Sequence, residues 1–88
     1  MAQSVHVRLY GTRFCPYCIR ARMLLKQKGI DYADIPVGGD PEVFATMVAL
    51  SGRQTVPQIF IGDHHVGGYD DLAAADRSGV LDQLMRSE

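Results

Sequence analysis

The sequence is short of the features that mark several large classes of protein. It has two cysteines in 88 residues, a number that favours a reducing compartment over a disulfide-stabilised secreted domain. Its 9 basic and 10 acidic residues leave a formal net charge of −1, so no nucleic-acid or acidic lipid surface is implied. No apolar run approaches bilayer length, and residues 1–4 lack the pattern of a secretory signal. We expect a cytoplasmic protein with no membrane or nucleic-acid partner.

The length of the chain and its lack of a linker or repeat predict one domain. A chain of 88 residues supplies a modest core and leaves no room for a second one. No internal repeat, linker or low-complexity tract interrupts it. The expected boundaries of the domain are therefore residues 1–88.

Both cysteines lie in one stretch, Phe14-Cys15-Pro16-Tyr17-Cys18, between an expected strand and an expected helix. Two sulfurs at positions i and i+3 around a helix start are close enough to form a disulfide. The first sulfur also meets free N–H groups of the helix start, which favour a thiolate. We therefore predict a thioredoxin-like redox motif in which Cys15 is the exposed nucleophile and Cys18 is a buried resolving thiol.

Two other readings of the cysteine pair are weaker. A structural disulfide across four residues would constrain the unfolded chain very little. Half a zinc site would need two further ligands, and the candidates His6, His64 and His65 do not follow the cysteines at finger spacing. A redox pair is the interpretation that we carry forward.

Alternation and turn signals predict the order βαβαββα, followed by a further short helix. The first strand, helix and second strand have the spacing of a βαβ unit with parallel strands, and Gly62-Asp63 suits a hairpin turn. We expect an α/β, thioredoxin-like fold with a four-stranded mixed sheet flanked by helices. The expected strands are 5–10, 30–37, 55–61 and 64–66, and the expected helices begin near 16, 41, 70 and 80.

Helical spacing also predicts which side chains are buried. The strand neighbours His64 and His65 should point to opposite faces, as surface residues and not as a metal pair. The basic side chains of the first helix are expected to face solvent, where their charge helps stabilise a thiolate; they are Arg20, Arg22, Lys26 and Lys28. The expected core positions of the helices are Ile19, Met23, Leu24, Val43, Phe44, Met47, Val48, Leu50, Val80, Leu81, Leu84 and Met85.

Three motifs together carry a resemblance that covers nearly the whole chain. They are C-P-Y-C at 15–18, T-V-P-Q-I-F-I-G at 55–62 and G-G-Y-D-D-L at 67–72. At these separations the set is highly specific, and the chain resembles the glutaredoxin family, in particular small bacterial members of its dithiol class. The resemblance implies an enzyme that exchanges thiols and disulfides, with Cys15 and Cys18 as catalytic residues that form a redox-active disulfide.

The resemblance also implies a reductant and substrates. Glutathione is expected to be the reductant, with no permanently bound cofactor and no metal. The expected partners are glutathione itself and disulfide-bonded or glutathionylated proteins. A monomer is the expected state.

The family places glutathione beside the T-V-P and G-G motifs. There Pro57 is expected to be cis, which turns the main chain of Val56 outward to pair with an extended peptide. The Gly67-Gly68 pair lets the backbone pass close under a ligand, and the helix start beyond it suits a carboxylate. We expect Asp70 to be the N-cap, with either Asp70 or Asp71 binding the ammonium group. The expected glutathione-binding residues are Arg13, Tyr17, Thr55, Val56, Pro57, Gly68, Tyr69, Asp70 and Asp71.

The chain departs from the family at two positions that concern the glycyl carboxylate of glutathione. Thr12 stands where many members have a lysine, and Arg13 is its expected substitute. Phe44 stands where many have a polar or basic residue, and Arg53 or Gln54 would have to compensate.

Two alternatives remain open at this stage. One is a redoxin of the same fold that is reduced by thioredoxin reductase and makes little use of glutathione. The other is a carrier or sensor, not an enzyme, that holds an iron–sulfur cluster between two chains through Cys15. Pro16 should stiffen the loop against the second alternative.

Overall fold

The computed structural model describes residues 3–86, and its elements follow the predicted order. Each helix begins and ends near the expected turn residues, and glycines with positive φ end α2 at Gly52 and α3 at Gly79. Within the described part of the chain no helix is both long and apolar enough to cross a membrane. The elements are β1 (Val7–Gly11), α1 (Pro16–Gln27), β2 (Ala33–Pro36), α2 (Pro41–Ser51), β3 (Gln58–Ile61), β4 (His64–Gly67), α3 (Tyr69–Ser78) and α4 (Val80–Arg86).

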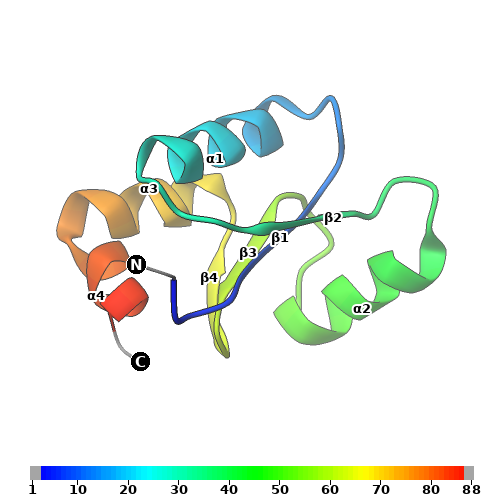
Figure 1. The fold of residues 1–88 in the computed structure, drawn as a ribbon. Helices are drawn as coiled ribbons and strands as arrows, with labels where there is room; N and C mark the ends of the chain where they lie inside the picture. The colour runs from blue at the N-terminus through cyan, green and yellow to red at the C-terminus, as the bar shows by residue number, and fades with distance from the viewer. Residues whose placement is uncertain (1–2, 87–88) are drawn as a thin grey trace.

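The four strands form one mixed sheet in the order β2-β1-β3-β4 (Figure 1). β1 pairs with β2 in parallel and with β3 antiparallel, and β3 pairs antiparallel with β4. The parallel pair is the predicted βαβ unit, and the predicted hairpin turn at Gly62 has a positive φ of 58°. The expected thioredoxin-like arrangement of four strands and flanking helices is confirmed.

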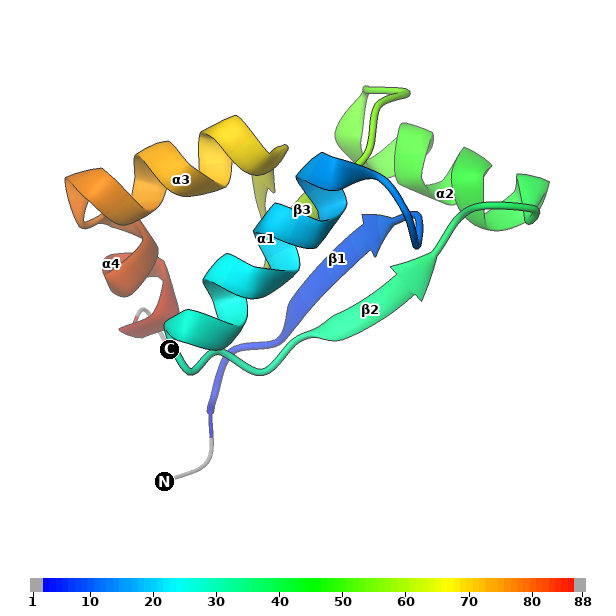
Figure 2. The same cartoon turned by 90° about the horizontal axis from the view of Figure 1, so that it is seen from above.

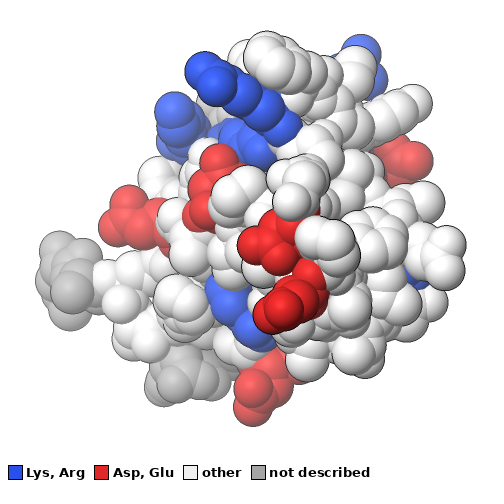
Figure 3. Space-filling view, turned by 90° about the vertical axis from the view of Figure 1, so that its right-hand side faces the viewer, with Lys and Arg blue, Asp and Glu red and all other residues white. Residues whose placement is uncertain are grey.

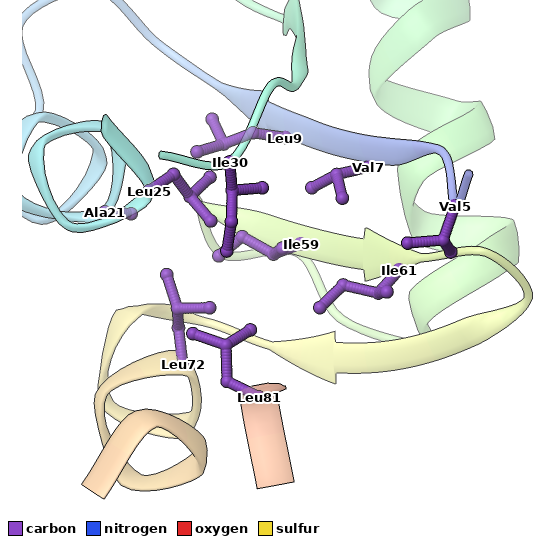
Figure 4. Close-up of a cluster of buried hydrophobic side chains, with 10 residues drawn as sticks. All are labelled: Val5, Val7, Leu9, Ala21, Leu25, Ile30, Ile59, Ile61, Leu72 and Leu81. Carbon is purple, nitrogen blue, oxygen red and sulfur yellow. The ribbon is translucent and has the colours of Figure 1, made fainter. Parts of the chain in front are cut away.

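Helices cover both faces of the sheet (Figures 1 and 2). Because successive strand residues point to opposite faces, the strands contribute side chains to two separate cores. On one face, strand residues pack against α1, α3 and α4; this core comprises Val5, Val7, Leu9, Ala21, Leu25, Ile30, Ile59, Ile61, Leu72 and Leu81 (Figure 4). On the other face, a smaller core of Tyr10, Val37, Met47 and Phe60 packs against α2. Each fully buried leucine contributes about 1.5–3 kcal/mol through burial, so both helix layers are anchored to the sheet.

The expected buried face was wrong at four positions. In α1 the buried residues are Cys18, Ala21 and Leu25, whereas Ile19 and Met23 are exposed. The small Ala21 lets the helix approach the sheet along that stripe, and this choice of contact sets the rotation of the helix. The other wrong assignments are Leu50 and Val80, which are 49% and 41% exposed at the ends of their helices.

Candidate active site

Cys15 lies at the start of α1, after the loop that follows the carboxyl end of β1. Cys15 is the N-cap residue and Pro16 occupies the first turn, where a missing N–H has no cost. No acidic residue lies in that first turn, so the free N–H groups meet no competing negative charge. Cys15 is partly exposed while Cys18 is fully buried, and both are free thiols.

The surroundings of the two thiols push their pKa values in opposite directions. Desolvation raises the pKa of Cys15. This effect is outweighed by hydrogen bonds from Cys18 and from the Tyr17 N–H and by the positive charge of Arg22, so the pKa of Cys15 lies below its ordinary value. For Cys18, desolvation again comes first and the neighbouring Cys15 adds to it, so its pKa is raised. At neutral pH the accessible sulfur is therefore the more nucleophilic one, which agrees with the predicted division between the two thiols.

The buried sulfur of Cys18 rests against the end of β1. The Thr12 N–H donates to Cys18 Sγ at 3.5 Å. A methyl group on Gly11 would stand 2.9 Å from the same sulfur and 3.1 Å from Leu9 Cδ2, closer than carbon and sulfur pack. Gly11 is therefore a site residue that the sequence motifs did not single out, because its small size matters only once the fold brings Cys18 against β1.

Arg22 is not the solvent-facing residue that we expected. Its guanidinium donates to the Thr12 carbonyl oxygen at 2.8 Å and forms an ion pair with Asp34 at 3.1 Å, with 18% of its side chain exposed. It thus joins α1 to the loop after β1 and to β2, directly behind the cysteines. The expected electrostatic help from this helix comes chiefly from Arg22, since it is the cation that lowers the pKa of Cys15.

The segment before β3 presents an open main chain. The Val56–Pro57 peptide bond is cis, as predicted, and Pro57 is buried. Within residues 3–86 neither the N–H nor the C=O of Val56 has a hydrogen-bond partner. An extended peptide could pair with these two groups as an added strand.

The start of α3 is built differently from the prediction. Gly68, and not Asp70, is the N-cap of a helix that begins at Tyr69. Asp71 reaches back to accept a hydrogen bond from the Gly68 N–H at 3.0 Å, as an N3 carboxylate does in a capping box. Gly67 has a φ of 119°, and a methyl group there would overlap the Asp71 carboxylate. Asp70 is exposed at the same helix start.

Contacts between these segments bring most of the predicted site residues together. The ring of Tyr17, 51% exposed, lies 6.4 Å from that of Tyr69 between centroids, so the starts of α1 and α3 meet. A methyl group on Gly68 would reach 3.5 Å from the Pro57 carbonyl oxygen, which joins α3 to the T-V-P segment. The structure therefore assembles one surface region from three motifs that are far apart in the sequence.

The residues expected to compensate for Thr12 and Phe44 lie in different parts of the site. Arg13 is exposed, with its guanidinium 5.5 Å from the Phe14 ring centroid, and lines a pocket of about 400 Å³ with Arg22, Asp34 and Pro36. Phe44 is half-buried against the smaller core. Arg53 instead binds Asp71 Oδ2 at 3.0 Å, so it lies at the α3 side and lowers the pKa of Asp71.

Basic side chains gather beside the cysteines. Figure 3 shows a group of Lys and Arg side chains toward the top of the molecule, at the level where Figure 1 places the start of α1, and a mixture of acidic and basic side chains lower down. In this region Arg20 also lies over the Tyr17 ring, 5.6 Å from its centroid. The approach to Cys15 is therefore positively charged on the α1 side.

Sequence reasoning also missed a polar pair inside the sheet. His64 is exposed as expected, but His65 is half-buried, and its Nε2 lies 2.7 Å from Oε1 of the fully buried Gln58. Burial lowers the pKa of His65, and the charge of Arg53 adds to this effect. A glutamine in the apolar run Q-I-F-I was the available signal, because a buried amide requires partners. Among residues 3–86 no cluster of three or more His, Cys, Asp or Glu could hold a metal ion.

Comparison with known proteins identifies the family. The family model described as Glutaredoxin matches residues 7–66. The chain belongs to the glutaredoxin family. It is accordingly a thiol–disulfide oxidoreductase, and the matched glutaredoxin residues include both cysteines and the T-V-P segment.

Relatives and solved structures extend this match over almost the whole chain. A glutaredoxin of Pseudomonas aeruginosa is 52% identical over 79 residues, covering 90% of this chain and 94% of its own. Glutaredoxin 3 of Escherichia coli is 46% identical over 81 residues, covering 92% and 98%. The solution structure of glutaredoxin from Brucella melitensis has a TM-score of 0.83 at 48% identity, covering 96% and 91%. The crystal structure of a buckwheat glutaredoxin–glutathione complex has a TM-score of 0.85 at 28% identity, covering 97% and 80%.

Proposed function

We propose that this glutaredoxin uses glutathione to reduce protein disulfides and glutathione mixed disulfides through Cys15 and Cys18. The observation that carries the proposal is the accessible Cys15, whose pKa is lowered at the start of α1 by hydrogen bonds and by the charge of Arg22, beside a fully buried Cys18. The solved relative that contains glutathione supports the choice of reductant, because its backbone superposes with a TM-score of 0.85.

For a glutathionylated protein, Cys15 alone completes the reaction. Its thiolate attacks the glutathione sulfur, so the Cys15–glutathione disulfide forms and the protein thiolate leaves. A second glutathione thiolate then attacks that disulfide, releasing oxidised glutathione and restoring the Cys15 thiolate. For a protein disulfide, Cys18 resolves the mixed intermediate, and glutathione reduces the resulting Cys15–Cys18 disulfide in two steps.

We propose that the peptide lies along the Thr55-Val56-Pro57 segment toward α3. The free N–H and C=O of Val56 would pair with its cysteinyl residue, and Tyr17 would flank its sulfur. The γ-glutamyl carboxylate would bind main-chain N–H groups at Tyr69, Asp70 and Asp71, where a helix begins.

Charged groups would hold the two ends of glutathione. Oδ2 of Asp71 is held by Arg53 and the Gly68 N–H, which leaves Oδ1 for the ammonium group. At the glycyl end Arg13 would bind the carboxylate, since Arg22 is engaged with Asp34 and Thr12.

We also infer the setting of this reaction. The two cysteines can cycle only where reduced glutathione is replenished, which favours the cytoplasm. We also propose that residues 1–88 form one domain that acts as a monomer.

Two cysteine variants test the proposal. Turnover is followed as NADPH loss with glutathione and glutathione reductase, using a glutathionylated peptide, and with thioredoxin reductase in parallel on a protein disulfide. We expect Cys15→Ser to abolish both reductions, and Cys18→Ser to keep reduction of the peptide while losing reduction of the protein disulfide. Equal behaviour of the two variants would contradict the assigned roles, and turnover only with thioredoxin reductase would contradict the use of glutathione.

A further inference from the structure

The buried side chain of Gln58 has a fixed orientation. Among residues 3–86 it is the one fully buried polar side chain, and no buried side-chain polar atom in that range lacks a partner. Gln58 Nε2 lies 3.1 Å from the carbonyl oxygen and 3.2 Å from the hydroxyl oxygen of Thr55. A carbonyl oxygen can only accept, so the amide nitrogen must point at Thr55 and the amide oxygen must point away from it.

That orientation also fixes the role of His65. Because Gln58 Oε1 is an acceptor, the contact at 2.7 Å requires His65 Nε2 to carry the proton and donate it. The imidazole ring lies 4.9 Å from the Phe60 ring between centroids, at 30° between planes. Hydrogen bonds therefore run in one direction, from His65 through Gln58 to Thr55, and the stacked ring holds the donor in place.

This chain of hydrogen bonds joins the two segments between which the peptide is proposed to lie. Thr55 immediately precedes Val56, and His65 lies two residues before Gly67 on β4. The register of the sheet changes here, with Phe60 opposite His65 and Ile59 opposite Gly67, so a bulge aims His65 back at Gln58. At the surface the Arg53–Asp71 ion pair joins the same two segments, but it is half exposed and therefore contributes little rigidity.

We propose that His65 and Gln58 are positioning residues that hold the Thr55–Val56 main chain in register with β4 and thereby set the affinity of this surface region for glutathione. The inference rests on the proposed use of glutathione. Neither side chain touches the reacting sulfurs, so both act through the main chain of Val56. Their effect falls on the KM for glutathione and not on the reactivity of Cys15.

Two substitutions of His65 separate the hydrogen bond from the ring. His65→Phe keeps an aromatic ring beside Phe60 and removes the donor, whereas His65→Gln keeps an N–H donor at similar reach and removes the ring. His64→Phe is the matched control, because His64 is the exposed neighbour on the same strand.

The first measurement is glutathione-dependent reduction of a glutathionylated peptide, at a temperature where circular dichroism shows every variant folded. We expect His65→Phe to raise the KM for glutathione about three- to tenfold, the range that one net hydrogen bond contributes, with kcat and the iodoacetamide reactivity of Cys15 within about twofold. His65→Gln should return the KM to within about threefold of the parent value, and His64→Phe should not change it. An unchanged KM in His65→Phe, or a His65→Gln variant as weak as His65→Phe, would overturn the proposal.

The second measurement needs no glutathione and so separates this inference from the proposed function. Backbone order parameters of Thr55 and Val56 from nitrogen relaxation report their mobility directly. They should fall in His65→Phe and be retained in His65→Gln. If the parent protein does not turn over glutathione, the proposed function fails; equal order parameters in all variants would instead overturn the positioning role.

Discussion

Gly67→Ala should damage both the stability and the glutathione site, because two separate costs meet at this position. A non-glycine residue at a positive φ, here 119°, costs about 1–3 kcal/mol. The new methyl group would also overlap the Asp71 carboxylate and displace it. That displacement breaks the hydrogen bond from the Gly68 N–H, which is about 0.5–1.5 kcal/mol, and the surface ion pair with Arg53, which is about 0.2–1 kcal/mol.

Gly39→Ala is the control that isolates the first cost. Gly39 also has a positive φ, 76°, but a methyl group there meets nothing within 4 Å. Both substitutions restrict the unfolded chain equally, so that contribution cancels. The structure therefore predicts that Gly67→Ala loses roughly 0.7–2.5 kcal/mol more than Gly39→Ala.

Urea unfolding followed by circular dichroism measures this difference, since the chain has no tryptophan for fluorescence. In a domain of this size the difference corresponds to about 3–20 °C in Tm. The KM for glutathione should rise in Gly67→Ala and stay unchanged in Gly39→Ala. Equal losses of stability in the two variants would show that the Asp71 carboxylate moves freely, and would refute the argument that Gly67 fixes it.

Three further predictions follow from individual contacts of the site. Arg22→Gln should raise the pKa of Cys15 by removing a nearby positive charge, so the pH profile of its alkylation by iodoacetamide should move to higher pH; an unchanged profile would contradict this role. Gly11→Ala should lower the unfolding free energy by about 1–3 kcal/mol through overpacking against Cys18, measured by urea unfolding, and a neutral result would mean that the buried sulfur relocates easily. The guanidinium of Arg53 lowers the pKa of Asp71 in the folded state, so the Asp71 carboxylate stabilises the fold above its unfolded pKa and loses that contribution as pH falls below about 4. The unfolding free energy of Asp71→Asn should therefore fall less steeply with decreasing pH than that of the parent protein. An equal slope in the two proteins would contradict the assignment.

The order of helices and strands was predictable because it depends on local signals. Alternating apolar residues, glycines and prolines between them, and the hairpin turn at Gly62-Asp63 each act over a few residues. The family motifs added the cis bond before Pro57, and the structure has that bond.

The faces of the helices were less predictable, because helical spacing gives a stripe but not the partner that it meets. Ile19 and Met23 form a plausible apolar stripe, yet α1 turns Cys18, Ala21 and Leu25 inward. The N-cap of α3 was misassigned for a related reason. Aspartate is a common N-cap, but the chain turns at Gly67 and Gly68, so Asp71 caps the helix from its third position.

By itself the sequence determined the chemistry of this protein, since two cysteines three positions apart at a helix start already define an exposed and a buried thiol. Only the tertiary structure decided what surrounds them. Arg22 meets Thr12 and Asp34 because β2 lies beside β1, and His65 meets Gln58 because a bulge aligns β4 with β3. These contacts join residues far apart in the sequence, and their geometry depends on how strands pair and helices dock, which no local pattern specifies.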